Sequence, residues 1–161
     1  LGHDIEASWL IYKTMQVLGL DKIGGTEYDL SDITKALAEN IYEVVKNDSA
    51  KQFLNGSPAE SENGKVLETR IWWVQCECMV GFVNAYNQRE LEMLLSASEG
   101  QGSMDDSSEK YLRAVISLWK FIKNKMVDDR VPSEWLNEVE MDGSNVGKPI
   151  VDEWKCPYHN G

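Results

Sequence analysis

The sequence predicts an all-α protein built from helical hairpins whose connecting loops carry short β-hairpins. Apolar residues recur at three- and four-residue spacings in four segments, the pattern of helices that bury one face. Two polar segments between and after these helices are rich in Asn, Ser, Gly and Asp, which favours turns and short strands. The order helix, helix, hairpin loop therefore occurs twice, as in an α-solenoid or a ring of helical hairpins.

The first hairpin should consist of two amphipathic helices. The first helix is expected to start near Ile5 and to end at the helix breaker Gly24-Gly25. The second should cover residues 32–45, with Asp29 or Ser31 as its N-cap, because a short polar side chain there can accept a free backbone N–H.

The second half repeats this order. A loop that turns at Asn63-Gly64 should lead into a third helix with little polar surface, which indicates a largely buried rod. A linker, an amphipathic fourth helix and a strand-and-turn signal follow. The expected ranges are 47–69 for the loop, 72–86 for the third helix, 99–108 for the linker, 109–126 for the fourth helix, 134–139 for the strand and 142–144 for the turn.

Charge and composition favour an uncharged ligand. The chain has 16 basic and 27 acidic residues, a net charge of -11, so no nucleic-acid or anionic-membrane partner is expected. No apolar run approaches the roughly 18 residues of a membrane span, and we expect a cytoplasmic protein that is monomeric in its intact form. The odd number of cysteines, Cys76, Cys78 and Cys156, suggests neither a disulfide framework nor a zinc site.

The only two histidines, His3 and His159, lie near opposite ends of the chain. His3 and Glu6 are one helical turn apart, so Glu6 could accept a hydrogen bond from one ring nitrogen and leave the other as a base. An acidic first turn favoured by the helix dipole would give the same pattern. His159 follows the bend-forming Pro157 in a polar run, where it could be a second base or a surface histidine.

Six tryptophans are many for 161 residues, and aromatic faces commonly pack against sugar rings. Trp72 and Trp73 are adjacent on the expected third helix and therefore point in different directions. One of them should pack in the core and the other could face a cavity. Trp9 and Trp119 are both expected in the core.

Three motifs resemble the cellobiose 2-epimerase branch of the N-acylglucosamine 2-epimerase superfamily. They are GHDIEASWL at 2–10, RIWWVQCE at 70–77 and WKCPYHNG at 154–161, supported by WKFIKN at 119–124 and EW at 134–135. The resemblance implies an (α/α)6 barrel whose loops on one face form the sugar site. Residues 1–161 would be one partial domain, the C-terminal portion of that barrel. The N-terminal half, with an arginine of the site, and the last helix would be absent, so the isolated piece would be inactive.

The resemblance also implies an isomerase that converts reducing-end glucose to mannose, as in cellobiose to glucosyl-mannose. One base would remove the C2 proton to give an enediolate, and the proton would return from the other side. His3, oriented by Glu6, and His159 would be the two bases. No cofactor and no metal are implied, and the partner is a small sugar. The implied substrate-binding residues are Trp72, Trp73, Glu77 and Trp154.

Several alternatives remain open at this point. N-acylglucosamine 2-epimerase and mannose isomerase also transfer protons with two histidines, but on other sugars. A non-catalytic sugar-binding module would keep the aromatic surface without turnover, and a metal site on His3 and Glu6 would be a different chemistry. Leu136-Asn137 stands where the family often has two aromatic residues, which weakens the prediction of a disaccharide substrate.

Overall fold

The computed structural model describes residues 1–21, 24, 26–48, 55–99, 108–130, 134–155 and 158–159. This part of the chain is mostly helical, which confirms the predicted fold class. The expected linker around 100–107 and Cys156 lie outside the described residues. In chain order, the elements are α1 (Gly2–Leu18), α2 (Leu30–Asp48), β1 (Ser61–Glu62), β2 (Lys65–Val66), β3 (Arg70–Ile71), α3 (Trp72–Ser98), α4 (Glu109–Phe121), the π-helical turn η1 (Ile122–Met126) and β4 (Glu138–Val139).

The first helix ends earlier than predicted, and the second has the expected cap. Gly19 adopts a left-handed conformation (φ 64°) and its backbone N–H donates to the Met15 carbonyl oxygen, which terminates α1 before Gly24 is reached. The Asp29 carboxylate accepts the backbone N–H groups of Ser31, at 2.7 Å, and Asp32, at 3.3 Å. Asp29 is therefore the N-cap of α2.

Helix α3 extends to Ser98, well beyond the predicted end at residue 86. The added turns carry Leu91, Leu94 and Leu95, which have helical spacing but are exposed. The spacing of apolar residues therefore does not predict burial in this part of α3. Strong helix formers continue the helix there, and Glu92 accepts hydrogen bonds from Ser31 and Lys35 of α2. Helix α4 follows its predicted range, but its last turn widens into η1, where the Val127 N–H donates to the Ile122 carbonyl five residues back.

The predicted loop hairpin is present. Strands β1 and β2 pair antiparallel around a turn in which Asn63 (φ 50°) and Gly64 (φ 77°) are both left-handed. Strand β4 pairs with β3 instead of folding back fully on its own segment, although one bridge joins Val139 to Asn145. The β3–β4 pair ties the start of α3 to the C-terminal loop.

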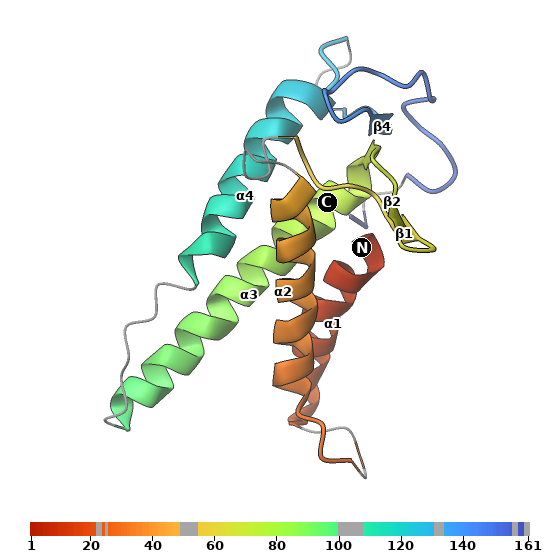
Figure 1. Ribbon diagram of the computed structural model, residues 1–161. Coiled ribbons are helices and arrows are strands. Elements are labelled where there is room, and N and C mark those ends of the chain that lie inside the picture. Colours follow the sequence, from red (N-terminus) through yellow and green to blue (C-terminus); the bar gives the residue numbers. More distant parts are fainter. Residues whose placement is uncertain are drawn as a thin grey trace.

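Figure 1 shows α1, α2 and α3 side by side, with α4 along α3. Helices α1 and α3 start at the same end of the molecule, where the strands, the blue C-terminal loop and both chain ends gather. Trp119, expected in the core, is 46% exposed on α4. The described helices include none that is long and apolar enough to cross a membrane. The core between the helices contains Ile5, Ala38, Ile41, Val45, Val74, Cys78, Phe82, Ala85, Tyr111, Ala114 and Leu118.

Candidate functional site

A cavity of about 450 Å³ opens at this end of the molecule, a volume within the roughly 300–1,000 Å³ typical of small-molecule sites. It brings together side chains from the first turn of α1, the start of α3 and the C-terminal loop, which are far apart in the sequence. Six of the seven predicted site residues are among its lining. The lining residues are His3, Glu6, Ile71, Trp72, Trp73, Asn137, Asp152, Trp154, Tyr158 and His159.

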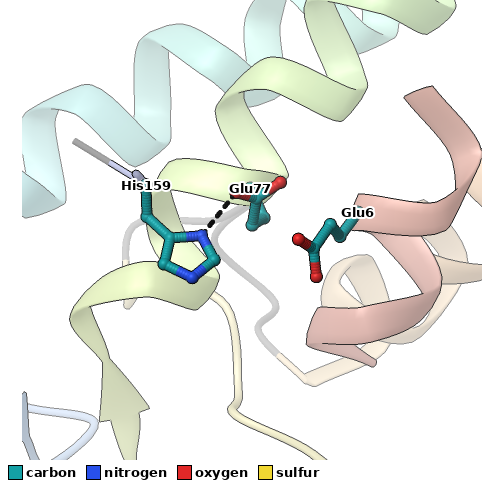
Figure 2. A group of neighbouring side chains, drawn as sticks. All are labelled: Glu6, Glu77 and His159. Atoms are coloured by element: carbon teal, nitrogen blue, oxygen red, sulfur yellow. Dashed lines mark hydrogen bonds and ion pairs between the residues drawn. The ribbon is translucent and has the colours of Figure 1, made fainter. Parts of the chain in front are cut away.

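His159 is held by the seventh predicted residue, Glu77. The His159 Nδ1 atom lies 2.7 Å from Glu77 Oε1, and Figure 2 shows the imidazole ring facing this carboxylate from the C-terminal loop. Because a carboxylate only accepts hydrogen bonds, Nδ1 is assigned the proton and Nε2 is left as the basic nitrogen. The Glu77 side chain is 3% exposed and the His159 side chain 18% exposed, so this hydrogen bond is shielded from solvent.

Both carboxylate oxygens of Glu77 have partners within the protein. Oε2 accepts the indole N–H of Trp9 from α1, at 2.7 Å, while Oε1 bonds to His159. The Trp9 side chain is half-buried beside the site. Its indole N–H links α1 to α3 by this hydrogen bond. The sequence had suggested that Glu77 contacts the sugar directly. We now expect Glu77 to orient His159 instead.

His3 has a carboxylate partner, but not the expected one. Its Nδ1 atom lies 2.9 Å from Glu60 Oε1, on the segment just before β1. The predicted hydrogen bond from His3 to Glu6 is not formed among the described residues, because the His3 ring turns toward the loop and not along its own helix. The His3 side chain is 77% exposed and that of Glu60 is 30% exposed.

A buried amide fixes the loop that carries Glu60. Gln75, on the first turn of α3, is fully buried and forms two hydrogen bonds with the backbone of Ser57: it accepts the N–H at 2.7 Å and donates to the carbonyl at 2.8 Å. The fully buried Arg70 donates to the Asn55 carbonyl oxygen at 2.7 Å. The position of Glu60 is therefore set by α3, the helix that also carries Glu77.

Glu6 accepts a hydrogen bond from the Tyr158 hydroxyl, at 3.1 Å. This bond raises the pKa of the Tyr158 phenol, because donating to a carboxylate favours the protonated form. The hydroxyl group is consequently a hydrogen-bond donor throughout the neutral range. Sequence reasoning overlooked Tyr158, although its place next to His159 in the third motif could have suggested a role.

The two adjacent tryptophans differ as predicted. Trp72 is 3% exposed and packs with Phe121 and Met126 in a second core cluster. Trp73 is half-buried, and its ring centroid lies 4.9 Å from that of His3 and 5.3 Å from that of His159. Both histidine rings therefore lie against one indole, that of Trp73. The Trp72 ring also lies near His159, at 5.5 Å between centroids.

One group of side chains has the composition of a metal site. Ligand atoms of Glu6, Glu77 and His159 all lie within 4.8 Å of one another. Figure 2 shows the three side chains pointing toward one another. Two carboxylates and an imidazole could hold a divalent cation. The hydrogen bonds that Glu77 already makes to His159 and Trp9 favour proton transfer at this position instead.

The two described cysteines lie behind the site and are free thiols. Burial raises the pKa of both Cys76 and Cys78 to about 12. Because the thiolate is the reactive form, these cysteines are packing residues and not nucleophiles.

Comparisons with known proteins show what this chain is similar to. No family model matches the chain. It is 37% identical to a cellobiose 2-epimerase of Dictyoglomus turgidum over 161 residues, and 34% identical to one of Ruminococcus albus. These alignments cover 99% of the chain and 34% and 35% of the two relatives. Among solved structures, a cellobiose 2-epimerase from Bacillus thermoamylovorans matches with a TM-score of 0.74 and 37% identity, over 99% of this chain and 34% of that one.

The shared features are both sequence and fold. The helices superpose on part of the helical barrel of these proteins, and the identity extends along almost the entire chain. The chain spans about a third of the length of the curated relatives it matches. It is therefore related to the cellobiose 2-epimerases and has the fold of one portion of their barrel.

Proposed function

We propose that this chain carries the proton-transferring part of a sugar 2-epimerase, which interconverts glucose and mannose at the reducing end of a disaccharide such as cellobiose. The observation that carries the proposal is the pair of histidines in one cavity. Each is bonded through Nδ1 to its own carboxylate, His3 to Glu60 and His159 to Glu77, and both lie against Trp73. The names of the relatives support the same activity.

This arrangement suits the removal of a proton from one face of the sugar C2 atom and the delivery of a proton to the opposite face. In the open-chain sugar, the C2–H bond is acidified by the C1 aldehyde. One imidazole takes the C2 proton through Nε2, and the electron pair moves onto the aldehyde oxygen to give an enediolate. The other histidine, in its protonated form, donates a proton to the opposite face of C2. The sugar is neither oxidised nor reduced, and only the configuration at C2 changes.

The polar groups around the bases have separate roles in this proposal. The carboxylates of Glu60 and Glu77 stabilise an imidazolium and keep each ring in its tautomer. Trp73 offers a flat surface to the sugar ring, and Trp72 and Trp154 also line the cavity. The Tyr158 hydroxyl, held by Glu6, can donate to a substrate oxygen as negative charge develops.

The test is isotope exchange in the full-length protein that contains this chain. With cellobiose in D₂O, NMR should show deuterium at C2 of the reducing-end ring and a mannose-ended product. His3→Ala and His159→Ala should each lower the rate by roughly 10²–10⁴, the usual contribution of a positioned acid or base. Glu62→Gln, an exposed carboxylate on β1, is the control and should leave the rate unchanged.

The results separate the remaining activities. Exchange with N-acetylmannosamine or free mannose, but not with cellobiose, would assign the chain to another epimerase or isomerase reaction. Binding of cellobiose without deuterium incorporation would indicate a sugar-binding protein. Full activity in either histidine variant would overturn the two-base proposal.

A cation held by Glu6, Glu77 and His159 is the second candidate, since their ligand atoms cluster within 4.8 Å. If a metal were essential, dialysis against EDTA would abolish exchange, and Zn²⁺ or Mn²⁺ would restore it. The two-histidine reaction needs no metal, so we expect the rate to survive EDTA and metal analysis to find no stoichiometric ion.

A further inference from the structure

A lysine inside the C-terminal loop lies just ahead of the segment that carries His159. The Lys155 side chain is 4% exposed, and its ammonium forms an ion pair with Glu134, at 2.6 Å. It also donates to two backbone carbonyl oxygens, those of Trp135 and of Ile150, the latter at 2.8 Å. An ammonium has three N–H donors, so these acceptors satisfy all of them. Burying such a charge is costly unless it is paired and hydrogen-bonded, and here it is both.

The acceptors belong to one loop, which the lysine closes. Glu134 and Trp135 stand at the start of this loop, and Ile150 stands near its end. The bond from Lys155 is the largest cause of the lowered pKa of Glu134, so this carboxyl group is charged at neutral pH. Lys155 thereby joins both ends of the loop to the point from which the chain continues toward His159.

Lys155 is also the last backbone anchor that the structure describes before His159. The Asp152 carboxylate accepts the backbone N–H groups of Trp154 and Lys155, both at 2.9 Å. The Asn137 side-chain amide donates to the same carboxylate, at 2.6 Å. After Lys155, no described residue forms a backbone hydrogen bond with another described residue. Four residues span at most about 14 Å, so a shift of this anchor changes where His159 can reach.

A shared indole connects Lys155 and His159 a second time. The Lys155 ammonium lies 5.6 Å from the centroid of the Trp72 ring, and the centroid of the His159 ring lies 5.5 Å from it, at 79°. Trp72 is 3% exposed, and its backbone N–H donates to the Asn137 carbonyl oxygen at 3.0 Å. A cation within about 6 Å of a ring centroid is attracted to the ring face. The ammonium and the imidazole therefore pack against the same fixed ring.

We propose that Lys155 is a positioning residue for the base His159: its ammonium fixes the start of the C-terminal segment so that the imidazole ring meets Glu77. This role rests on the proposed epimerase function and adds a residue on which one of its two bases depends. Lys155 is not among the described residues that line the cavity, so it acts on catalysis only through His159.

The tautomer of His159 is the property that this anchor controls. A neutral imidazole in water prefers its proton on Nε2. The bond from Nδ1 to Glu77 reverses this preference and leaves Nε2 as the basic nitrogen. An imidazole that moves away from Glu77 returns to the Nε2–H form, in which the nitrogen needed for proton removal is already protonated.

Nitrogen NMR of the full-length protein, labelled with ¹⁵N-histidine, measures this tautomer. The His159 signals are assigned by their loss in His159→Gln and should show a protonated Nδ1 in the natural protein. In Lys155→Met they should change to the Nε2–H pattern, while the signals of His3 stay as they are. Lys148→Met is the matched control, because it removes an exposed lysine of the same loop that is also paired with a glutamate, Glu138. It should leave both histidines unchanged.

The exchange of the C2 proton gives a second readout. If His159 loses its orientation, His3 alone can still remove and return the proton on its own face of C2, so exchange of one epimer continues while epimerisation slows. We expect Lys155→Met to lower kcat of epimerisation about tenfold or more, part of the roughly 10²–10⁴ of a positioned base, with KM within about threefold. In the His159→Ala background the same change should have no further effect. Glu134→Ala weakens the anchor from the other side and should cause a smaller loss of the same kind.

A changed His159 tautomer together with a selective loss of epimerisation supports the role of Lys155. Natural His159 signals in a folded Lys155→Met protein would overturn it, and so would an equal further loss in the His159→Ala background. If Lys155→Met does not fold, the same two readouts in Glu134→Ala decide the question. If the natural protein exchanges no sugar at all, the proposed function has failed, while the NMR comparison still tests whether Lys155 orients His159.

Discussion

Each histidine of the site takes its orientation from a carboxylate on a different element. Glu77 belongs to α3, and its bond to His159 is shielded from solvent. Glu60 belongs to the loop before β1 and holds the more exposed His3. The two candidate bases therefore lie in unequal environments, His159 shielded and His3 largely exposed.

Substituting Glu60 should impair His3 without removing it. In Glu60→Gln the neutral amide can still reach Nδ1, but it no longer stabilises an imidazolium. We expect kcat for C2 exchange to fall about tenfold, part of the 10²–10⁴ of a full acid–base group, with KM nearly unchanged. Glu6→Gln is the comparison. If Glu6→Gln lowered kcat more than Glu60→Gln, Glu6 and not Glu60 would be the functional partner of His3, as the sequence predicted.

The sequence was sufficient to select His3, His159 and Trp73, because they stand in recognisable motifs. It was not sufficient to select their partners. Glu60 is 57 residues from His3 and Glu77 is 82 residues from His159, and an i,i+3 argument only considers neighbours on one helix. Asn137 and Asp152 were missed for the same reason, since only the closure of the loop brings them together.

At the scale of elements, the contact between α1 and α3 controls the site, because α1 carries His3 and α3 carries Glu77. This contact is close at Gly81. A Cβ atom there would lie 2.5 Å from Ile5 Cγ1 and 3.1 Å from the Ile5 backbone oxygen. The second distance means that a side-chain movement alone cannot make room, and α1 has to shift.

Gly81→Ala should therefore destabilise the protein, although alanine is the better helix former. Overpacking usually costs about 1–3 kcal/mol and the gain in helix propensity is about 1 kcal/mol, so we expect the free energy of unfolding to fall by up to about 2 kcal/mol. A displaced α1 should also lower kcat/KM about tenfold or more, because misplacement by about 1 Å can be that costly. Urea denaturation and the exchange assay measure the two effects. Asn87→Ala, at an exposed position of α3, is the control and should change neither.

A charged cluster joins α2 to α3 and α4 away from the site. The Glu39 carboxylate on α2 accepts hydrogen bonds from Lys110 and Tyr111 on α4, and Arg89 on α3 donates to it at 3.2 Å. Burial opposes ionisation, but the bonds from Lys110 and Tyr111 and the charges of Lys110 and Arg89 outweigh it. The pKa of Glu39 is therefore lowered from 4.5.

The lowered pKa of Glu39 predicts that this residue stabilises the fold at neutral pH and less so in acid. A carboxyl group with a lowered pKa in the folded state stabilises the fold above its unfolded pKa, and this contribution is lost as the pH falls through the folded value. Glu39→Gln should cost on the order of 1–2 kcal/mol at pH 7, and the difference from the natural protein should shrink below about pH 4. Glu43→Gln, which removes an exposed partner of Lys46 on the same helix, should have little effect at either pH. A constant difference at all pH values would show that Glu39 acts by packing alone.

The arrangement of elements was only partly predictable. Helix type and order follow from apolar spacing, and Asp29 marks the start of α2 by its own chemistry. The full length of α3 could not be read from apolar spacing, because its last turns are helical without being buried. The pairing of β3 with β4 joins Arg70 to Val139 and Ile71 to Glu138, which are 69 and 67 positions apart, and no local signal encodes it.

At the scale of the molecule, the chain spans about a third of its relatives and leaves broad apolar faces exposed. Val17 and Leu18 on α1 and Leu94 and Leu95 on α3 are more than half exposed. In a ring of helical hairpins, each helix is covered by neighbours on both sides. Both histidines and the carboxylates bonded to them nevertheless lie within this chain, so each proposed base has its partner here.

The charge of the molecule predicts which sugars the site accepts. The net charge is -11, and the described residues that line the cavity include Glu6 and Asp152 but neither Lys nor Arg. A unit charge costs about 1 kcal/mol beside another at 4 Å even in water. A disaccharide with a carboxylate on its second ring should therefore show a kcat/KM about tenfold below that of cellobiose at low salt. Asp152→Asn should narrow this difference.

Salt distinguishes this repulsion from a steric effect. The Debye length falls from about 10 Å at 0.1 M salt to about 3 Å at 1 M, so added NaCl should raise kcat/KM for the acidic disaccharide and leave that for cellobiose unchanged. Steady-state rates for both sugars over this range make the measurement. If the acidic sugar remained a poor substrate at every salt concentration, the shape of the cavity and not its charge would exclude it. If it reacted as well as cellobiose throughout, a cation from outside this segment would have to neutralise the carboxylates of the cavity.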